Sequence, residues 1–187
     1  MENQTKNISW MVGGVIVAAA VVYLVVGGDV TIPSSTPKVE GTKTEQGTVV
    51  VPGTNAISDS GVVVNQDGIE VKSDAAYGSA EAPKASALVD KEALPDSVVK
   101  LEQIEGGFSP AEITVKAGRG VVLSVTGGSG CSFRFMDPAL GAIGIGVGPG
   151  ETRVVPFNAP DKKGEYKFFC DIPGYEARGW IGKMIVE

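Results

Sequence analysis

Short apolar strands separated by glycine- or proline-containing turns fill the C-terminal half of the chain, and this pattern restricts the fold more than any other feature. Apolar residues alternate with other residues, as in half-buried strands, at seven places: 99–101, 113–115, 121–125, 131–136, 152–157, 165–170 and 182–186. Turn signals separate them at 106–107, 117–120, 127–130 and 148–150. Seven or so short strands in about ninety residues predict an all-β fold, a Greek-key β-sandwich over residues 95–187.

Composition excludes several classes of function. The chain contains no histidine, so neither a Ser-His-Asp nor a Cys-His catalytic arrangement can be built, and we expect a protein that is not an enzyme. A net charge of −6 argues against the basic patch that nucleic-acid binding requires. The glycines at 141–146 are spaced only loosely like those of a phosphate-binding loop, and no helix signal follows them. We therefore expect an ordinary loop between strands there.

The N-terminal region carries a strong membrane signal. Residues 10–28 contain no charge, and a helix of that length crosses roughly 30 Å of hydrocarbon. We predict that residues 1–28 form a single transmembrane helix with a short tail, and that the C-terminal domain lies outside the cytoplasm. Lys6 and the terminal amine, against Glu2, indicate this orientation. A cleaved signal peptide is the alternative, although its apolar core is usually shorter.

Residues 29–94 have the composition of a tether. They are rich in Ser, Thr, Gly, Pro, Ala and Val, and Tyr77 is their single aromatic residue. They hold ten acidic and five basic side chains, so most of the net negative charge belongs to them. Such a segment buries little apolar surface, and we predict an acidic stalk. Within it, 61–64 and 69–71 flank the turn 65–68 and predict a short hairpin. The sequence leaves open whether residues 45–94 pack on the sandwich.

The C-terminal domain resembles the cupredoxins, the blue-copper family that includes plastocyanin and azurin. Four stretches carry the resemblance: FSPAEITVKAG at 108–118, GPGETRVVPFNAP at 148–160, GEYKFFC at 164–170 and GKMIV at 182–186. In that family, a loop shaped like FFCDIPGYEARGW at 168–180 carries a cysteine thiolate, then a histidine after a Pro-Gly turn, then a weak axial group. The resemblance therefore implies where a copper site would lie.

The ligands implied by the resemblance are mostly replaced. Cys170 stands at the thiolate position and Cys131 at the first histidine. Tyr175 stands at the second histidine and Trp180 at the axial methionine. Tryptophan offers a metal no lone pair, and a neutral tyrosine is a poor copper ligand. A His2Cys copper site therefore cannot be built from this chain.

Strand parity directs both cysteine side chains into the core, because Cys131 shares a face with Phe133, and Cys170 with Phe168. The resemblance implies that the two cysteines lie close together, and three interpretations remain open. They form a structural disulfide, which an oxidising compartment favours. They hold soft Cu(I), with Tyr175 as a further candidate ligand. They are two buried free thiols that act as small hydrophobes.

One surface could receive a protein partner. Six residues around the expected mouth of the site would form an apolar patch: Pro138, Leu140, Ile143, Pro173, Tyr175 and Trp180. Cupredoxins dock redox partners with a patch of this kind. Ordinary packing at the end of the domain explains these residues equally well.

The sequence thus predicts a membrane-anchored, extracytoplasmic cupredoxin-like module without a cofactor, in which a Cys131–Cys170 disulfide replaces the copper site. Such a module would act as a binding or structural surface domain. One alternative is a copper-binding electron-transfer or copper-handling protein with an altered cysteine site. Another is a subunit of a filament or surface assembly that associates through the N-terminal helix.

Overall fold

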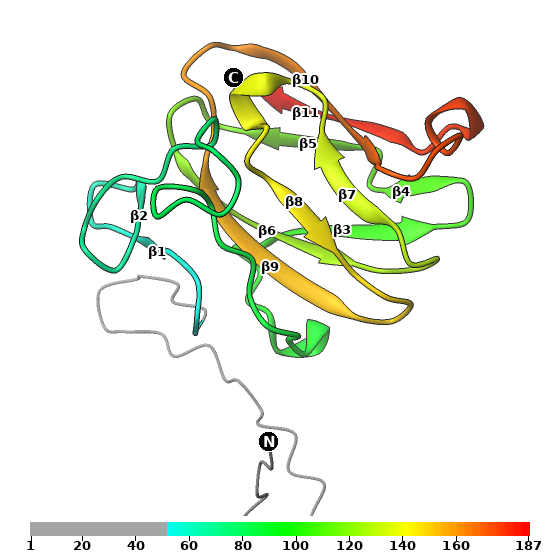
Figure 1. The fold of residues 1–187 in the computed structure, drawn as a ribbon, viewed down its shortest axis with the longest axis horizontal. Coiled ribbons are helices and arrows are strands. Elements are labelled where there is room, and N and C mark those ends of the chain that lie inside the picture. Colours follow the sequence, from blue (N-terminus) through cyan, green and yellow to red (C-terminus); the bar gives the residue numbers. More distant parts are fainter. Residues whose placement is uncertain (1–51) are drawn as a thin grey trace, which may run out of the picture. The chain divides into compact units, whose positions relative to one another are not determined.

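The computed structural model describes residues 52–187, which form a β-sandwich of two large sheets and a small two-stranded sheet (Figure 1). One sheet has the strand order β5-β11-β10-β7-β8: Glu112–Val115, Ile181–Val186, Gly164–Cys170, Ser132–Phe135 and Gly144–Gly146. The other has the order β4-β3-β6-β9: Gly107–Ser109, Val99–Ile104, Gly120–Thr126 and Thr152–Asn158. The predicted all-β sandwich is confirmed for this part of the chain. Over the same residues no helix is long and apolar enough to span a membrane, and the predicted anchor at 10–28 lies outside them.

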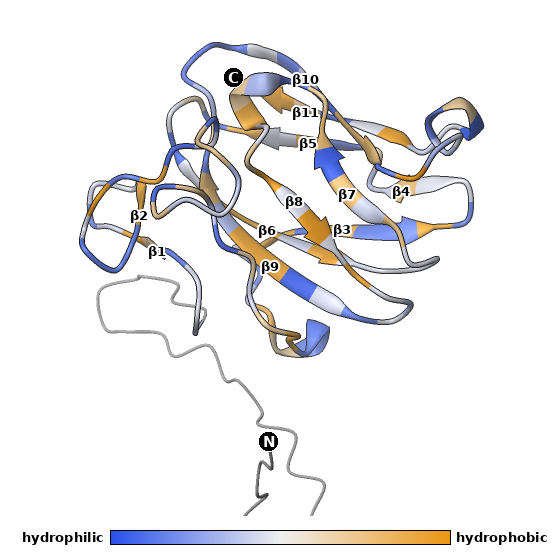
Figure 2. Ribbon diagram, viewed as in Figure 1, coloured by the Kyte–Doolittle hydropathy of each residue, from blue (hydrophilic) through white to orange (hydrophobic). Residues whose placement is uncertain are grey.

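Alternation along the strands builds the core. In β10 the side chains of Tyr166, Phe168 and Cys170 are buried while the residues between them are exposed or half-buried. β11 buries every second residue in the same way. Because successive side chains of a strand point to opposite faces, each sheet presents one apolar face to the other. The apolar residues follow the strands of both sheets in Figure 2.

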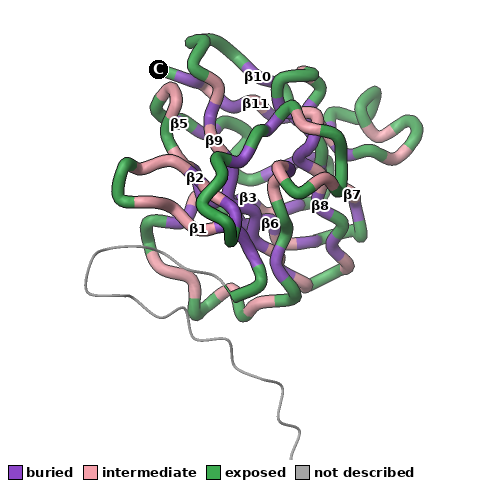
Figure 3. The backbone as a smooth tube through the Cα atoms, turned by 60° about the vertical axis from the view of Figure 1, so that its left-hand side comes forward, coloured by how far each residue is buried: buried purple, intermediate pink, exposed green. Residues whose placement is uncertain are grey.

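A second, smaller apolar layer covers the outer face of the four-stranded sheet. β6 has a run of five buried residues instead of an alternation, so both of its faces are covered. On the outer face, Val122 and Val154 pack with Val98, and Ile57 and Val89 from the segment before the sandwich lie against them. The buried stretches of β6 and β9 are visible in Figure 3. A near-continuous apolar run in a strand is the expected signature of burial on both faces.

Residues 52–94 are the source of this outer layer. They contain the short strands β1 (Ala56–Ile57) and β2 (Val63–Val64) and the 3-10 turn η1 (Lys91–Ala93). The 65–68 turn lies where the sequence analysis expected a hairpin, and the Val71 N–H donates to the Val63 carbonyl at 2.9 Å beside it. The folded unit therefore extends further toward the N-terminus than residue 95, where the sequence analysis placed its start, and at least the part of the expected stalk from residue 52 onward packs on the sandwich.

Hydrogen bonds to β9 hold this segment in place. The Ser86 N–H donates to the Val154 carbonyl at 2.8 Å, and the Val89 N–H donates to the Thr152 carbonyl at 2.9 Å. The Asn158 side chain accepts from the Val63 N–H at 2.7 Å and donates to the Val63 carbonyl at 3.2 Å. Residues 86–89 thus cover the free edge of β9. The composition of this segment gave no sign of that role.

Besides β1, two strands are absent from the sequence expectations. β8 lies within 141–146, which we expected to be a loop, and β4 begins at Gly107, the second residue of the expected 106–107 turn. Each has a single large apolar residue, Phe108 or Ile145, so no alternation can be read from the sequence. β8 exists because it pairs with β7 and buries Ile145 in the core. Two further 3-10 turns complete the domain, η2 (Pro138–Leu140) and η3 (Glu176–Arg178).

Candidate functional site

A disulfide joins Cys131, which directly precedes β7, to Cys170, the last residue of β10. Their Cα atoms lie 5.7 Å apart, and each residue is about 1% exposed. The pairing follows from the sheet, because β7 and β10 are antiparallel neighbours and the Asp171 N–H donates to the Ser132 carbonyl at 2.7 Å. Of the three interpretations that the sequence left open, the structure contains the disulfide.

A buried glutamine fixes the backbone at one end of this bridge. Gln103, on β3 of the opposite sheet, is only 4% exposed. Its side-chain nitrogen donates to the Cys131 carbonyl at 2.9 Å, and its side-chain oxygen accepts from the Cys131 N–H at 3.3 Å. Sequence reasoning missed this residue, although one signal was present: Gln103 shares the inward face of its strand with Leu101, and a polar side chain there needs a partner.

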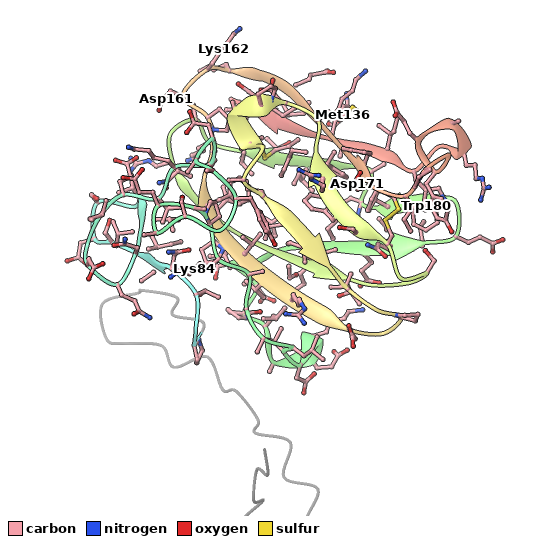
Figure 4. All side chains as sticks on the ribbon, viewed as in Figure 1. Lys84, Met136, Asp161, Lys162, Asp171 and Trp180 are labelled. Carbon is pink, nitrogen blue, oxygen red and sulfur yellow. A yellow bond between two sulfur atoms is a disulfide. The ribbon has the colours of Figure 1, made fainter. Side chains whose placement is uncertain are left out.

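Trp180 covers the disulfide from the side of the β10–β11 connection. It is 6% exposed, and its ring meets Phe108 edge to face with the centroids 6.0 Å apart. Its backbone carbonyl accepts a hydrogen bond from the Cys170 N–H at 3.2 Å. Trp180 marks the disulfide end of the sandwich in Figure 4. Trp180 therefore closes the core at the position where the resemblance to cupredoxins places a weak axial ligand.

Tyr175 lies half-buried against Trp180, with ring centroids 5.2 Å apart. The Arg178 guanidinium also lies over the Tyr175 ring, 5.1 Å from its centroid. Gly179 then adopts φ 90°, a left-handed conformation open to glycine, which turns the chain back into β11. Tyr175 is therefore held by an aromatic ring and a cation, in the geometry of a packing residue.

Comparison with known proteins identifies the fold family. A family model described as the cupredoxin-like domain matches residues 80–186. The chain belongs to the cupredoxin-like family. Comparison with curated proteins found no match.

Solved cupredoxins are similar to this chain at low identity. A dithionite-reduced auracyanin from Roseiflexus castenholzii is 18% identical with a TM-score of 0.43, over 49% of this chain and 98% of the auracyanin. Auracyanin B is 19% identical with a TM-score of 0.43, over 57% and 98%. A reduced amicyanin mutant is 15% identical with a TM-score of 0.40, over 56% and 99%.

The donor set of this cupredoxin-like domain does not fit a blue-copper centre. The two sulfur atoms are bonded to each other, so neither is the thiolate that copper binds. Trp180 offers only an N–H, and Tyr175 packs against the Trp180 ring and the Arg178 guanidinium. Within residues 52–187 no group of three or more His, Cys, Asp or Glu side chains is placed to hold a metal ion.

The expected apolar patch does not form as one surface. Leu140 and Ile143 are fully buried, and Trp180 nearly so. Pro138 follows the far end of β7, where the Met136 N–H bonds to the Lys167 carbonyl, whereas Pro173 follows Cys170 at the opposite end of β10. Some of these side chains point into the core, and the others lie at opposite ends of the strands. The prediction that they form one continuous apolar surface was therefore wrong.

The end of the sandwich away from the disulfide is polar. A cleft of about 620 Å³ there is lined by charged residues of both signs, among them Asp137, Asp161 and Lys162. Tyr166 lies beside it, and its hydroxyl donates to the Lys162 carbonyl at 2.7 Å. Burial, with a smaller contribution from the Asp137 carboxylate, raises the pKa of Tyr166 above its usual 10.0.

Proposed function

We propose that this protein is a non-catalytic surface module, anchored in a membrane through residues 10–28, whose cupredoxin-like domain lies outside the cytoplasm and serves as a binding or structural domain. The observation that carries the proposal is the Cys131–Cys170 disulfide. It joins the two positions that the resemblance assigns to the copper-binding thiolate and the first histidine, and it leaves no thiolate for a metal. A domain built this way keeps the rigidity of the fold without the redox chemistry of copper.

The disulfide also supports the proposed location. Disulfides form and persist in oxidising compartments and are rare in a reducing cytoplasm. The apolar run at 10–28 provides the signal that would take the domain to such a compartment. Loss of membrane association on deletion of residues 1–28 would test the anchor, and cleavage of the domain by protease added outside intact cells would test the orientation.

One measurement tests the replacement of copper. Full-length protein purified without reductant is analysed by intact mass, thiol counting and elemental analysis for copper. We expect no free thiol and no copper. Two free thiols with near-stoichiometric copper would overturn the proposal and would make Cys131 and Cys170 ligands of a soft-metal site.

A further inference from the structure

A shallow groove of about 380 Å³ lies on the outer face of β7 and β8, on the far side of the sheet from the core. Its floor is made of glycine backbone. A Cβ atom at Gly146 would meet nothing within 4 Å, and one at Gly144 would meet only the Arg134 side chain at 3.8 Å. The volume falls at the lower end of the roughly 300 to 1,000 Å³ typical of small-molecule sites. A flat ligand can therefore lie directly on the strand.

Tyr77 forms one wall of the groove and is 80% exposed, an unusual position for a large aromatic side chain. Its loop is nevertheless tied down. The Lys72 N–H donates to the Glu81 carbonyl at 2.8 Å, closing the loop, and the Ala142 N–H donates to the Ser73 carbonyl at 3.0 Å, fixing it beside the start of β8. The ring is thus presented to solvent from a fixed backbone, which lowers the entropy cost of stacking a ligand on it.

Polar side chains also line the groove. The Arg134 guanidinium lies 3.1 Å from the Asp171 carboxylate, and the two side chains are 47% and 43% exposed. Ser132 adds a hydroxyl beside them. Arginine supplies several N–H donors in a plane and aspartate supplies two acceptor oxygens, so neighbouring hydroxyl groups of one ligand can find both kinds of partner. The charges cancel, so the groove does not select an ion.

The free edge of β8 adds backbone groups. The Ser132 carbonyl accepts a hydrogen bond from beyond the end of β10, so the backbone groups of Ser132 point toward that strand. Backbone groups of successive residues in a strand point to opposite sides, so Phe133 is the residue that exchanges hydrogen bonds with Ile145 of β8. The N–H and carbonyl groups of Gly144 and Gly146 therefore point away from β7. Among residues 52–187, no turn or loop backbone bonds to them. They offer donors and acceptors along the rim of the groove.

From these features we infer that the groove binds a neutral carbohydrate. A sugar ring has an apolar C–H face, which Tyr77 can stack on, and an edge of hydroxyl groups, which Arg134, Asp171 and the β8 backbone can satisfy. The site deepens the binding role proposed above and rests on it. An extended peptide is less well matched, because β8 offers only three residues for strand addition.

The test is a titration of full-length protein, in a detergent without a sugar head group, with cellobiose, maltose, mannobiose and N,N′-diacetylchitobiose. Saturation-transfer NMR on the sugar protons reports binding at dissociation constants on the order of 1 mM. We expect at least one sugar to bind through its C–H face. Tyr77→Ala should weaken that binding at least about tenfold, and Tyr77→Phe, which keeps the ring, should change it less than about twofold.

Two further variants separate the groove from the fold. Gly146→Val places a side chain in open space on the floor and should abolish binding without unfolding the domain. Leu88→Ala removes a half-exposed apolar side chain outside the groove, and binding should stay unchanged.

Three outcomes would overturn the inference. In the first, no sugar binds to the folded protein. In the second, wild type and Gly146→Val bind the sugar equally well. In the third, no sugar binds, and peptides selected from a random library bind in a way that depends on Gly146. None of them would alter the thiol and copper result, so failure here is distinguishable from failure of the proposed function.

Discussion

Removing the disulfide should cost the domain much of its stability. Cys131 and Cys170 are separated by 39 residues, and the bridge closes that loop in the unfolded chain as well as in the folded one. We expect the double variant Cys131→Ala, Cys170→Ala to fold to the same sandwich with a markedly lower free energy of unfolding.

The magnitude follows from the loop length. In the chain-entropy model, closing a loop of this size removes about 13 cal/mol/K from the unfolded ensemble, which is about 4 kcal/mol at 25 °C. Both side chains are almost fully buried, so replacing them with alanine adds a packing loss of about 1 kcal/mol. A loss of this size should lower the melting temperature by on the order of 10 to 15 °C.

The assay is urea denaturation of full-length protein carrying Trp10→Phe, so that the fluorescence of Trp180 beside the bridge is the reporter. Wild-type protein with its disulfide reduced is the matched control, because it has the same side chains and lacks only the crosslink. Reduced wild type should account for most of the loss, and the double variant should be slightly less stable still.

A small effect would refute this reasoning. If oxidised and reduced wild type differ by less than about 1 kcal/mol, the bridge does not act as the main constraint on the unfolded chain. If the reduced protein loses its fold altogether, the estimate is too low and the pairing of β7 with β10 depends on the bridge.

Three further predictions concern packing, the covering segment and pH. Trp180→Ala should lower the free energy of unfolding by about 3 to 5 kcal/mol, because it leaves a cavity beside Phe108 in the core. A loss below about 1 kcal/mol, measured by calorimetry, would contradict this prediction. Asn158→Ala leaves the Val63 N–H and the Val71 carbonyl without their side-chain partner, which should lower the free energy of unfolding by about 1 to 3 kcal/mol. Amide hydrogen exchange should accelerate at residues 56–73 but not in β10. Because the pKa of Tyr166 is raised on folding, the free energy of unfolding should fall as the pH rises from about 10 through the folded pKa, and Tyr166→Phe should make that fall shallower in urea titrations.

The strands of the two sheets were largely predictable because their alternation is long enough to read. The inward direction of Cys131 and Cys170 followed from parity with neighbouring aromatic residues, and the structure places both in the core. The resemblance added only their proximity. Two alternating apolar residues, such as Val99 and Leu101, are sufficient to assign faces, whereas the single one in β8, Ile145, is not.

The covering segment was the main difference from expectation. Residues 52–94 are poor in large apolar side chains, which is why composition predicted a stalk. They pack nonetheless, because β6 and β9 offer Val122 and Val154 on an outer face that would otherwise meet water, and because a few buried hydrogen bonds such as those of Ser86 fix the path. The doubly apolar run of β6 was the readable signal of this cover.

By itself, the sequence determined the sandwich, the inward direction of both cysteines and the lack of histidine ligands, because these depend on local periodicity and residue chemistry. Only the tertiary structure decided that the sulfur atoms are bonded and that Gln103 holds the Cys131 backbone. It likewise decided that Tyr77 lines the same groove as Gly144 and Gly146. Each of these joins residues far apart in the chain, and such contacts depend on strand register and sheet packing, which no local pattern specifies.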